Sequence, residues 1–258
     1  MQVGIFSTQE AAADYAAEHI IHVINSASDP VLGVATGSTP LALYERLRAA
    51  HAAGTFSLEG KQAIALDEYV GIADDHPERY RNVLRTELVG PEKTGLADEL
   101  LFTPDSSSSD PVQAAAEYDA KIRELGGATI QILGIGADGH IAFNEPGGSL
   151  VSRTHVDVLT AQTRTDNARF FDNDLDKVPT ESISQGLGTI MEAKEVILLA
   201  FGENKARAVK ELVEGAVSAK WPATVLQMHA KVTVLVDEAA ASQLELADFY
   251  TERWNARH

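Results

Sequence analysis

The stretch ILGIGADGHIAFNEPGG, residues 132–148, gathers several groups that could carry out acid–base chemistry. Asp138, His140 and Glu145 lie close together in the chain. A histidine with carboxylates beside it can be held in one tautomer and can pass protons near neutral pH. One histidine with carboxylates alone is a poor match to common metal sites, and a purely structural histidine is the remaining alternative. Acid–base catalysis is therefore the favoured interpretation.

The same stretch has a glycine spacing that resembles a dinucleotide-binding loop. Gly134, Gly136 and Gly139 follow the G-x-G-x-x-G pattern directly after an apolar run. A dinucleotide loop needs a helix that opens at the third glycine, and here Pro146 and Gly147 follow too soon for one. The pattern therefore predicts no dinucleotide cofactor, and the glycines must have another role.

A second motif, TGSTP at residues 36–40, follows an apolar segment and precedes an amphipathic helical pattern. Thr39 suits the N-cap and Pro40 the first helical position, which would leave the N–H groups of Gly37 and Ser38 free to bind an anion. We expect a phosphate there. The alternative is an ordinary capped turn, and the absence of a following lysine excludes a Walker loop.

A third motif, DEYVG, places Asp67 and Glu68 directly after the apolar segment 63–66. A partly desolvated carboxylate at that position could abstract a proton from carbon. Taken alone, Asp67 would more often be a solvated surface group. No G-x-S-x-G string is present, so a serine triad is not expected.

The order of apolar and helical segments determines where these motifs meet. Segments of strand length alternate with helical patterns and are apolar throughout, which is typical of a parallel sheet covered on both faces. The predicted strands are 3–6, 31–35, 63–66, 100–102, 130–134, 196–201 and 232–236, and helices are predicted to start at Thr8, Pro40, Pro77, Pro111, Glu203 and Ala239. We therefore expect one doubly wound α/β domain over residues 1–258, with ligands at the carboxyl ends of its strands.

Residues 161–181 interrupt this alternation. The segment AQTRTDNARFFDNDLDKVPTE is polar, lacks a clear period and carries Arg164 and Arg169. Long segments without regular structure in compact domains are often lids over a site. This segment is therefore a candidate active-site lid.

Composition narrows the classes of function. The 258 residues carry a formal net charge of −17 and no cysteine. Binding to nucleic acid or to anionic membranes is not expected, because both depend on clustered cations. No disulfide is possible, no signal peptide or membrane span is evident, and a cytoplasmic location is expected. An anionic substrate would need a few cations concentrated at its site.

Taken together, the motifs resemble the glucosamine-6-phosphate deaminase family. The strings TGSTP, LDEYVG, GIGADGHIAFNEPG, SRTH, NARFFDND and FGENKARAV occur in the family's order between about residue 1 and residue 237. The resemblance implies a Rossmann-like αβα sandwich with a mostly parallel sheet and a lid. It also implies conversion of glucosamine 6-phosphate and water to fructose 6-phosphate and ammonia, without a cofactor.

The same resemblance assigns roles to individual residues. It implies that Asp67 moves a proton between C2 and C1 of the open-chain sugar, and that His140 opens the sugar ring. Asp138 and Glu145 would form the relay that orients and charges His140. The substrate phosphate would be bound by the residues Gly37, Ser38, Thr39, Arg169 and Lys205.

Two rival functions share this resemblance in part. Phosphogluconolactonases have the same fold and a phosphate loop, but lactone hydrolysis has no use for the proton shuttle that DEYVG implies. Sugar-phosphate sensors of transcriptional regulators usually carry a helix-turn-helix segment, and none is evident ahead of the first strand.

The resemblance also bears on regulation. Family members activated by N-acetylglucosamine 6-phosphate bind its phosphate between subunits, through serines after the NEP string and basic residues beyond. The matching positions here are Gly148, Ser149, His155 and Asp157, so one serine is missing and an acid replaces a base. The chain also ends soon after its last helical pattern. We expect no such activation, whereas a homo-oligomer remains possible.

Overall fold

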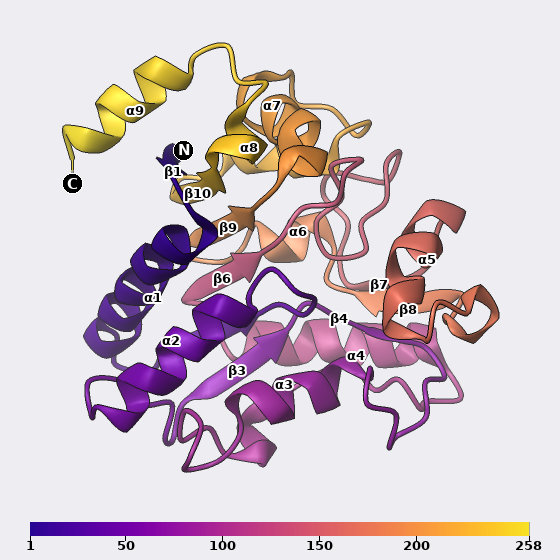
Figure 1. The fold of residues 1–258 in the computed structure, drawn as a ribbon. Helices are drawn as coiled ribbons and strands as arrows, with labels where there is room; N and C mark the ends of the chain where they lie inside the picture. The colour runs from indigo at the N-terminus through magenta and orange to yellow at the C-terminus, as the bar shows by residue number, and fades with distance from the viewer. Residues whose placement is uncertain (258) are drawn as a thin grey trace.

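The computed structural model describes residues 1–257 and contains two β-sheets (Figure 1). The larger sheet has seven strands in the order β1-β10-β9-β6-β2-β3-β5, and every neighbouring pair is parallel. Its strands are β1 Gln2–Phe6, β2 Val31–Val34, β3 Gln62–Ala65, β5 Leu101–Phe102, β6 Ile130–Leu133, β9 Val196–Ala200 and β10 Val232–Asp237. Each predicted strand segment overlaps one of them, so the predicted parallel sheet is confirmed.

Helices cover both faces of this sheet, as the right-handed crossover rule requires. One face carries α1 Gln9–Ser26, α2 Leu41–Ala52 and α3 Tyr80–Leu88, and the other carries α4 Pro111–Glu124, α6 Leu187–Ile190 and α7 Ala206–Glu214. Helices α8 Glu238–Ala241 and α9 Ala247–Asn255 follow β10, and α9 packs near β1. The chain changes winding direction between β5 and β6, so the topological switch point lies between β2 and β6.

The burial of the sheet explains why its strands are apolar throughout. All residues of β2, β6 and β9 are buried, because helices lie against both faces. Aliphatic side chains from these strands and from the covering helices form the main hydrophobic core. This core fixes the positions of the strand ends, from which the polar loops extend.

Sequence signals place most helix starts correctly. The Thr8 side chain accepts a hydrogen bond from the Ala11 N–H at 3.1 Å, and Asp110 caps α4 with Pro111 in its first position. The starts predicted at Thr8, Pro40 and Ala239 are each shifted by one residue, and the start predicted at Pro77 is wrong by three. The N-cap of α2 is Pro40 and not the predicted Thr39. Helix α2 begins at Leu41 because Pro40 occupies the cap position, with its carbonyl accepting from the Tyr44 N–H at 2.9 Å.

Helix α3 begins at Tyr80, three residues after the predicted start at Pro77. A buried carboxylate sets this start. Glu68 accepts hydrogen bonds from the N–H groups of Tyr80 at 3.0 Å and Arg81 at 2.9 Å, which would otherwise lack partners at the helix N-terminus. Glu68 therefore stabilises the start of a helix and does not line the site with Asp67.

A second, antiparallel sheet was not predicted from the sequence. It has the order β4-β8-β7, with β4 Asp67–Tyr69, β7 His155–Val158 and β8 Glu181–Ser184. These strands have only three or four residues and include polar ones, so they lack the apolar pattern of the main sheet. They lie beside the main sheet, near α5 Ala161–Asn167, in Figure 1.

The candidate lid is more regular than expected. Residues 161–181 contain α5 Ala161–Asn167 and two 3-10 helices, Ala168–Phe170 and Leu175–Lys177, before β8 begins. The prediction of a segment without regular structure was therefore wrong. The lid's hydrophobic contacts explain its order, because Ala168, Phe171 and Val178 pack in a small cluster with Tyr69 and Phe143.

Three further 3-10 helices complete the described structure, at Asp98–Leu100, Glu203–Lys205 and Pro222–Met228. The helix predicted at Glu203 starts as the second of these and continues as α7. Within residues 1–257, no helix is both long enough and apolar enough to cross a bilayer.

Candidate active site

The polar motifs follow four strands that are neighbours in the main sheet. The order β9-β6-β2-β3 places the loops after these strands side by side at the carboxyl edge. Lys205 follows β9, the Asp138–His140 motif follows β6, Gly37 follows β2, and Asp67 follows β3. Residues that are far apart in the sequence thus converge on the predicted edge.

The loop after β6 adopts no helix over residues 134–148, so the dinucleotide reading is excluded as expected. Gly136 has a different function. A Cβ atom at this position would lie 2.3 Å from His140 Nδ1 and 2.7 Å from Asp138 Oδ1. Gly139 has a φ of +85°, and a Cβ there would lie 2.6 Å from the Trp221 ring. Both glycines therefore make room for the His140 side chain and its tight turn.

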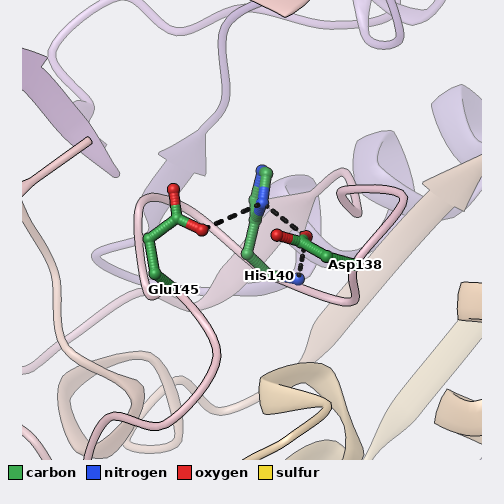
Figure 2. Close-up of side chains that lie close together, drawn as sticks. All are labelled: Asp138, His140 and Glu145. Carbon is green, nitrogen blue, oxygen red and sulfur yellow. Dashed lines mark hydrogen bonds and ion pairs between the residues drawn. The ribbon is translucent and has the colours of Figure 1, made fainter. Parts of the chain in front are cut away.

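Asp138, His140 and Glu145 converge in one cluster (Figure 2). His140 Nδ1 lies 2.8 Å from Asp138 Oδ1 and 4.0 Å from Glu145 Oε2. These are close charge contacts and not aligned hydrogen bonds, since neither His140 Nδ1 nor Glu145 Oε2 has a hydrogen-bond partner. Asp138 Oδ1 instead accepts from the His140 backbone N–H at 3.2 Å. The cluster thus contains two buried polar atoms that are free to take part in proton transfer.

Charge contacts set the state of Asp138. Burial alone would raise the pKa of Asp138, but its contacts with His140 outweigh burial and lower the pKa to about 2. Asp138 is therefore ionised beside the imidazole at neutral pH. The three side chains also offer one metal-ligating atom each within 4.8 Å of one another, so the cluster could hold a cation. That no metal is needed stays a prediction.

The turn that carries Glu145 is anchored to the second sheet. Ala142 adopts a φ of +51°, which is unusual for a residue with a side chain. The Phe143 N–H donates to Ser184 Oγ at 3.0 Å, and Asn144 Nδ2 donates to the Gln185 carbonyl at 2.8 Å. These bonds hold the turn in its strained conformation.

Asp67 starts β4, where it pairs with Ser184. The Asp67 side chain is only 6% exposed, and no hydrogen bond to its carboxyl group is found within residues 1–257. Burial, with a smaller effect from the charge of Glu68, raises the pKa of Asp67 to about 8. Because Ser184 also contacts Phe143, one short strand positions Asp67 relative to the Glu145 turn. An unpaired, desolvated carboxyl group of this kind is typical of catalytic sites.

The predicted phosphate-binding residues are brought together in part. The charges of Asp166, Arg169 and Asp138 all act on Lys205, and burial is the main cause that lowers the pKa of Lys205. Lys205 thus lies within electrostatic reach of Arg169 and of Asp138 in the His140 cluster.

The loop that contains Gly37, Ser38 and Thr39 follows β2. It shares the carboxyl edge of the main sheet with Lys205, which follows β9. Gly37 adopts a φ of +89° and faces open space. The conformation leaves room for an anion at this turn.

Sequence reasoning missed two residues of the cluster. Thr163 Oγ1 donates to Glu145 Oε1 at 2.5 Å, and Thr160 Oγ1 lies 3.3 Å from the same oxygen. Both threonines belong to the start of α5 in the lid. The only available signal was that Thr160 suits a helix N-cap, and the lid was not expected to contain a helix.

Comparisons with known proteins identify the family of the chain. Residues 7–235 match the model of a family described as glucosamine-6-phosphate isomerases/6-phosphogluconolactonase. The chain belongs to this family. A glucosamine-6-phosphate deaminase of Mycolicibacterium smegmatis is 53% identical over 257 residues, which are 100% of this chain and 98% of the relative.

Solved structures of the family share the architecture. A monomeric glucosamine-6-phosphate deaminase superimposes with a TM-score of 0.90 at 38% identity, covering 94% of this chain and 99% of that one. A 6-phosphogluconolactonase from Trypanosoma cruzi gives a TM-score of 0.76 at 20% identity, covering 95% and 97% of the two chains. The second likeness shows the fold alone, so the family's two activities are separated by the site and by the more similar relatives.

The buried carboxyl group of Asp67 predicts a pH-dependent stability in this family member. An unfolded aspartate ionises near about pH 4, whereas folded Asp67 ionises at about 8. Between these values the folded state keeps a proton that the unfolded state has lost, so wild-type stability falls as the pH rises from about 4 to about 8. Asp67→Asn removes the ionisable group, so its free energy of unfolding should not fall over this pH window. The difference in free energy of unfolding between the variant and wild type should therefore grow by several kcal/mol from about pH 4 to about pH 8 and then level off.

Urea unfolding at pH 5, 7 and 9 measures the effect. Asp75→Asn is the matched control, because Asp75 is exposed and should give curves parallel to wild type. If Asp67→Asn also gives parallel curves, Asp67 is not the buried, neutral group described above.

Proposed function

We propose that the protein is a glucosamine-6-phosphate deaminase, which converts glucosamine 6-phosphate and water to fructose 6-phosphate and ammonia. The observation that carries this proposal is Asp67, a buried and unpaired carboxyl group at the same sheet edge as the His140 cluster. Relatives with 53% and 38% identity that bear this name add support. The proposal places the enzyme in amino-sugar metabolism and, because sugar phosphates are retained in the cytoplasm, in that compartment.

The proposed reaction begins with ring opening. His140 moves the proton of the C1 hydroxyl to the ring oxygen, which gives the open-chain aldehyde. The ionised Asp138 beside Nδ1 and the nearby Glu145 carboxyl stabilise the imidazolium form during this transfer. The two carboxyl groups thus keep one imidazole able to both give and take a proton.

Asp67 then carries the isomerisation. Its carboxylate takes the proton from C2 while O1 takes a proton from the His140 imidazolium, which yields an enolamine. Asp67 then gives its proton to C1, and the nitrogen returns one proton to His140, which yields an imine at C2. Water adds to C2 and ammonia leaves, so the products balance the substrate and one water. Burial makes Asp67 a stronger base than an exposed aspartate, and the pKa of about 8 lies near the pH at which such a base works best.

The substrate phosphate is proposed to bind the residues Gly37, Ser38, Thr39, Arg169 and Lys205. In a chain with a net charge of −17, two adjacent cations are needed to attract a dianion to this edge. Free N–H groups at the start of α2 add donors. Lactone hydrolysis, the family's other activity, would leave Asp67 without a function, because it moves no proton between carbon atoms.

The first prediction from the proposed reaction concerns Asp67 as the base. Wild-type protein should release ammonia and fructose 6-phosphate from glucosamine 6-phosphate, with kcat/KM rising with pH up to about 8 as Asp67 ionises. Asp67→Asn should retain the fold and lose roughly 10²–10⁴-fold in kcat. Exchange of solvent deuterium into C1 should fall with it.

Asp75→Asn and added EDTA are the controls, and neither should change turnover. Ammonia release by Asp67→Asn at a near-normal rate would show that Asp67 is not the base. Hydrolysis of 6-phosphogluconolactone without any ammonia release would favour the lactonase, and binding without turnover would favour a sensor.

The second prediction concerns the phosphate. Lys205→Ala and Arg169→Ala should each lower kcat/KM for glucosamine 6-phosphate by about 10–100-fold, the usual worth of a charge-assisted contact. Inorganic phosphate should compete with substrate in wild type and compete less in both variants. Lys177→Ala is the control, because Lys177 is an exposed lid residue that pairs with Asp172. Unchanged inhibition by inorganic phosphate in Lys205→Ala and Arg169→Ala would show that the substrate phosphate binds elsewhere.

We further propose that N-acetylglucosamine 6-phosphate does not activate this enzyme. The Asp157 carboxylate lies 3.8 Å from His155 Nε2 and would face an effector phosphate as a like charge, costing roughly 1 kcal/mol or more. Ser149 Oγ accepts from the Val151 N–H at 3.3 Å, and Gly148 offers no side-chain donor. An effector phosphate would therefore meet one acidic group and one missing side-chain donor in this region.

The third prediction follows from this local chemistry. Rates should depend hyperbolically on glucosamine 6-phosphate, and added N-acetylglucosamine 6-phosphate should leave the curve unchanged. Steady-state kinetics with and without the acetylated sugar phosphate measure this. A sigmoidal curve that the acetylated sugar makes hyperbolic would contradict the proposal.

A further inference from the structure

The two oxygens of the Glu145 carboxyl group have different surroundings. Oε1 accepts a hydrogen bond from Thr163 Oγ1 at 2.5 Å and has Thr160 Oγ1 at 3.3 Å. Oε2 is buried, has no hydrogen-bond partner, and lies 4.0 Å from His140 Nδ1. Because Oε1 is fixed, the carboxyl group cannot rotate without breaking these bonds. Oε2 is therefore held toward the imidazole (Figure 2).

The two hydroxyl groups depend on the first turn of α5. Thr160 caps this helix by accepting from the Thr163 N–H at 3.1 Å, and its hydroxyl lies 3.0 Å from Thr163 Oγ1. Thr163 is only 3% exposed. The bond to Glu145 thus requires that α5 be formed and docked against the Glu145 turn.

The other end of α5 is tied to β4 and continues to the predicted phosphate ligand. Asn167 Nδ2 donates to the Tyr69 hydroxyl at 2.9 Å, and Tyr69 lies two residues after Asp67 in β4. Ala168 packs in the hydrophobic cluster with Tyr69, and Arg169 follows directly. One short segment therefore carries the hydroxyl groups that hold Glu145 and a cation proposed to bind substrate phosphate.

We propose that Thr163, supported by Thr160, is a positioning residue that holds the Glu145 carboxylate toward His140 only while the lid helix α5 is docked. The kinetic consequence of this proposal rests on the proposed deaminase function. The docked lid orients Glu145 for ring opening, so the acid–base step depends on two hydroxyl groups of the lid.

The charged groups around His140 determine which effect a substitution at Thr163 can isolate. Asp138 and Glu145 face the imidazole, and Lys205 acts on Asp138 from the loop after β9. Removing the Thr163 hydroxyl leaves all of these charges in place. Its effect must therefore come from the orientation of Glu145, which then spends less time near Nδ1.

The experiment compares Thr163→Val, which removes the hydroxyl at nearly constant size, with Thr163→Ser, which keeps it. Thr163→Val is expected to lower kcat by about 10–100-fold with KM within about threefold of wild type, because the phosphate ligands are unchanged. Thr163→Ser should stay within about threefold in both constants. Thr165→Val is the matched control, since Thr165 lies on the same helix, is exposed, and donates only to the Ala161 carbonyl at 2.7 Å.

A second measurement does not depend on turnover. The ring resonances of His140 are observed by NMR at one pH in the substrate-free protein. They should move in Thr163→Val, because the nearby carboxylate is less well held, and should not move in Thr163→Ser or Thr165→Val. If wild type shows no deaminase activity but this shift occurs, the positioning role stands and the proposed function fails.

Two results would overturn the inference. One is a Thr163→Val enzyme with wild-type kcat and unchanged His140 ring resonances. The other is an equal loss in Thr163→Ser, which would mean that the side chain acts by packing. Should Thr163→Val not fold, Thr163→Ala against Thr163→Ser gives the same comparison. Thr160 is not substituted, because it also caps α5.

Discussion

The carboxyl edge of the parallel sheet is the constraint on which the rest of this structure depends. Parallel strands end at one edge, so the loops after β9, β6, β2 and β3 meet there whatever their distance in the chain. The switch in winding direction between β2 and β6 opens this edge for a ligand. Placing Asp67 there, buried and unpaired, opposes folding at neutral pH, and the surrounding structure must offset that cost.

The backbone just before Asp67 is held by hydrogen bonds from Gln185, which follows β8, and from Tyr118 on α4. Gln185 donates from its backbone to the Leu66 carbonyl at 2.7 Å and from its side chain to the Ala65 carbonyl at 2.8 Å. The Tyr118 hydroxyl also donates to Ala65, at 2.7 Å. These bonds satisfy the backbone where the chain leaves β3, so the carboxyl group of Asp67 is delivered by a rigid element.

The glycine-rich loop shows how one spacing can serve two unrelated purposes. In a dinucleotide-binding loop the glycines let a pyrophosphate approach a helix N-terminus. Here Gly136 makes room for the imidazole of His140, and Gly139 takes a left-handed conformation against Trp221. The surrounding Asp138 and Glu145 distinguish the two cases, because a cluster of ionisable groups serves proton transfer and not the binding of an anionic cofactor.

The sequence by itself determined the main sheet and the motifs that meet at its carboxyl edge. Long apolar strands and proline-marked helix starts are local signals, so residues 130–134 and Pro111 could be placed without a structure. The grouping of Asp67 with the His140 motif followed from the rule that parallel strands share a carboxyl edge.

Only the tertiary structure decided which neighbouring polar residue does what. Asp67 and Glu68 are equivalent in the sequence, but Glu68 caps α3 through two backbone N–H groups while Asp67 is left unpaired. Likewise, Thr163 contacts Glu145 only because α5 forms from a segment with no clear period. Short strands and short helices carry little local signal, since their stability comes from the contacts they make after folding.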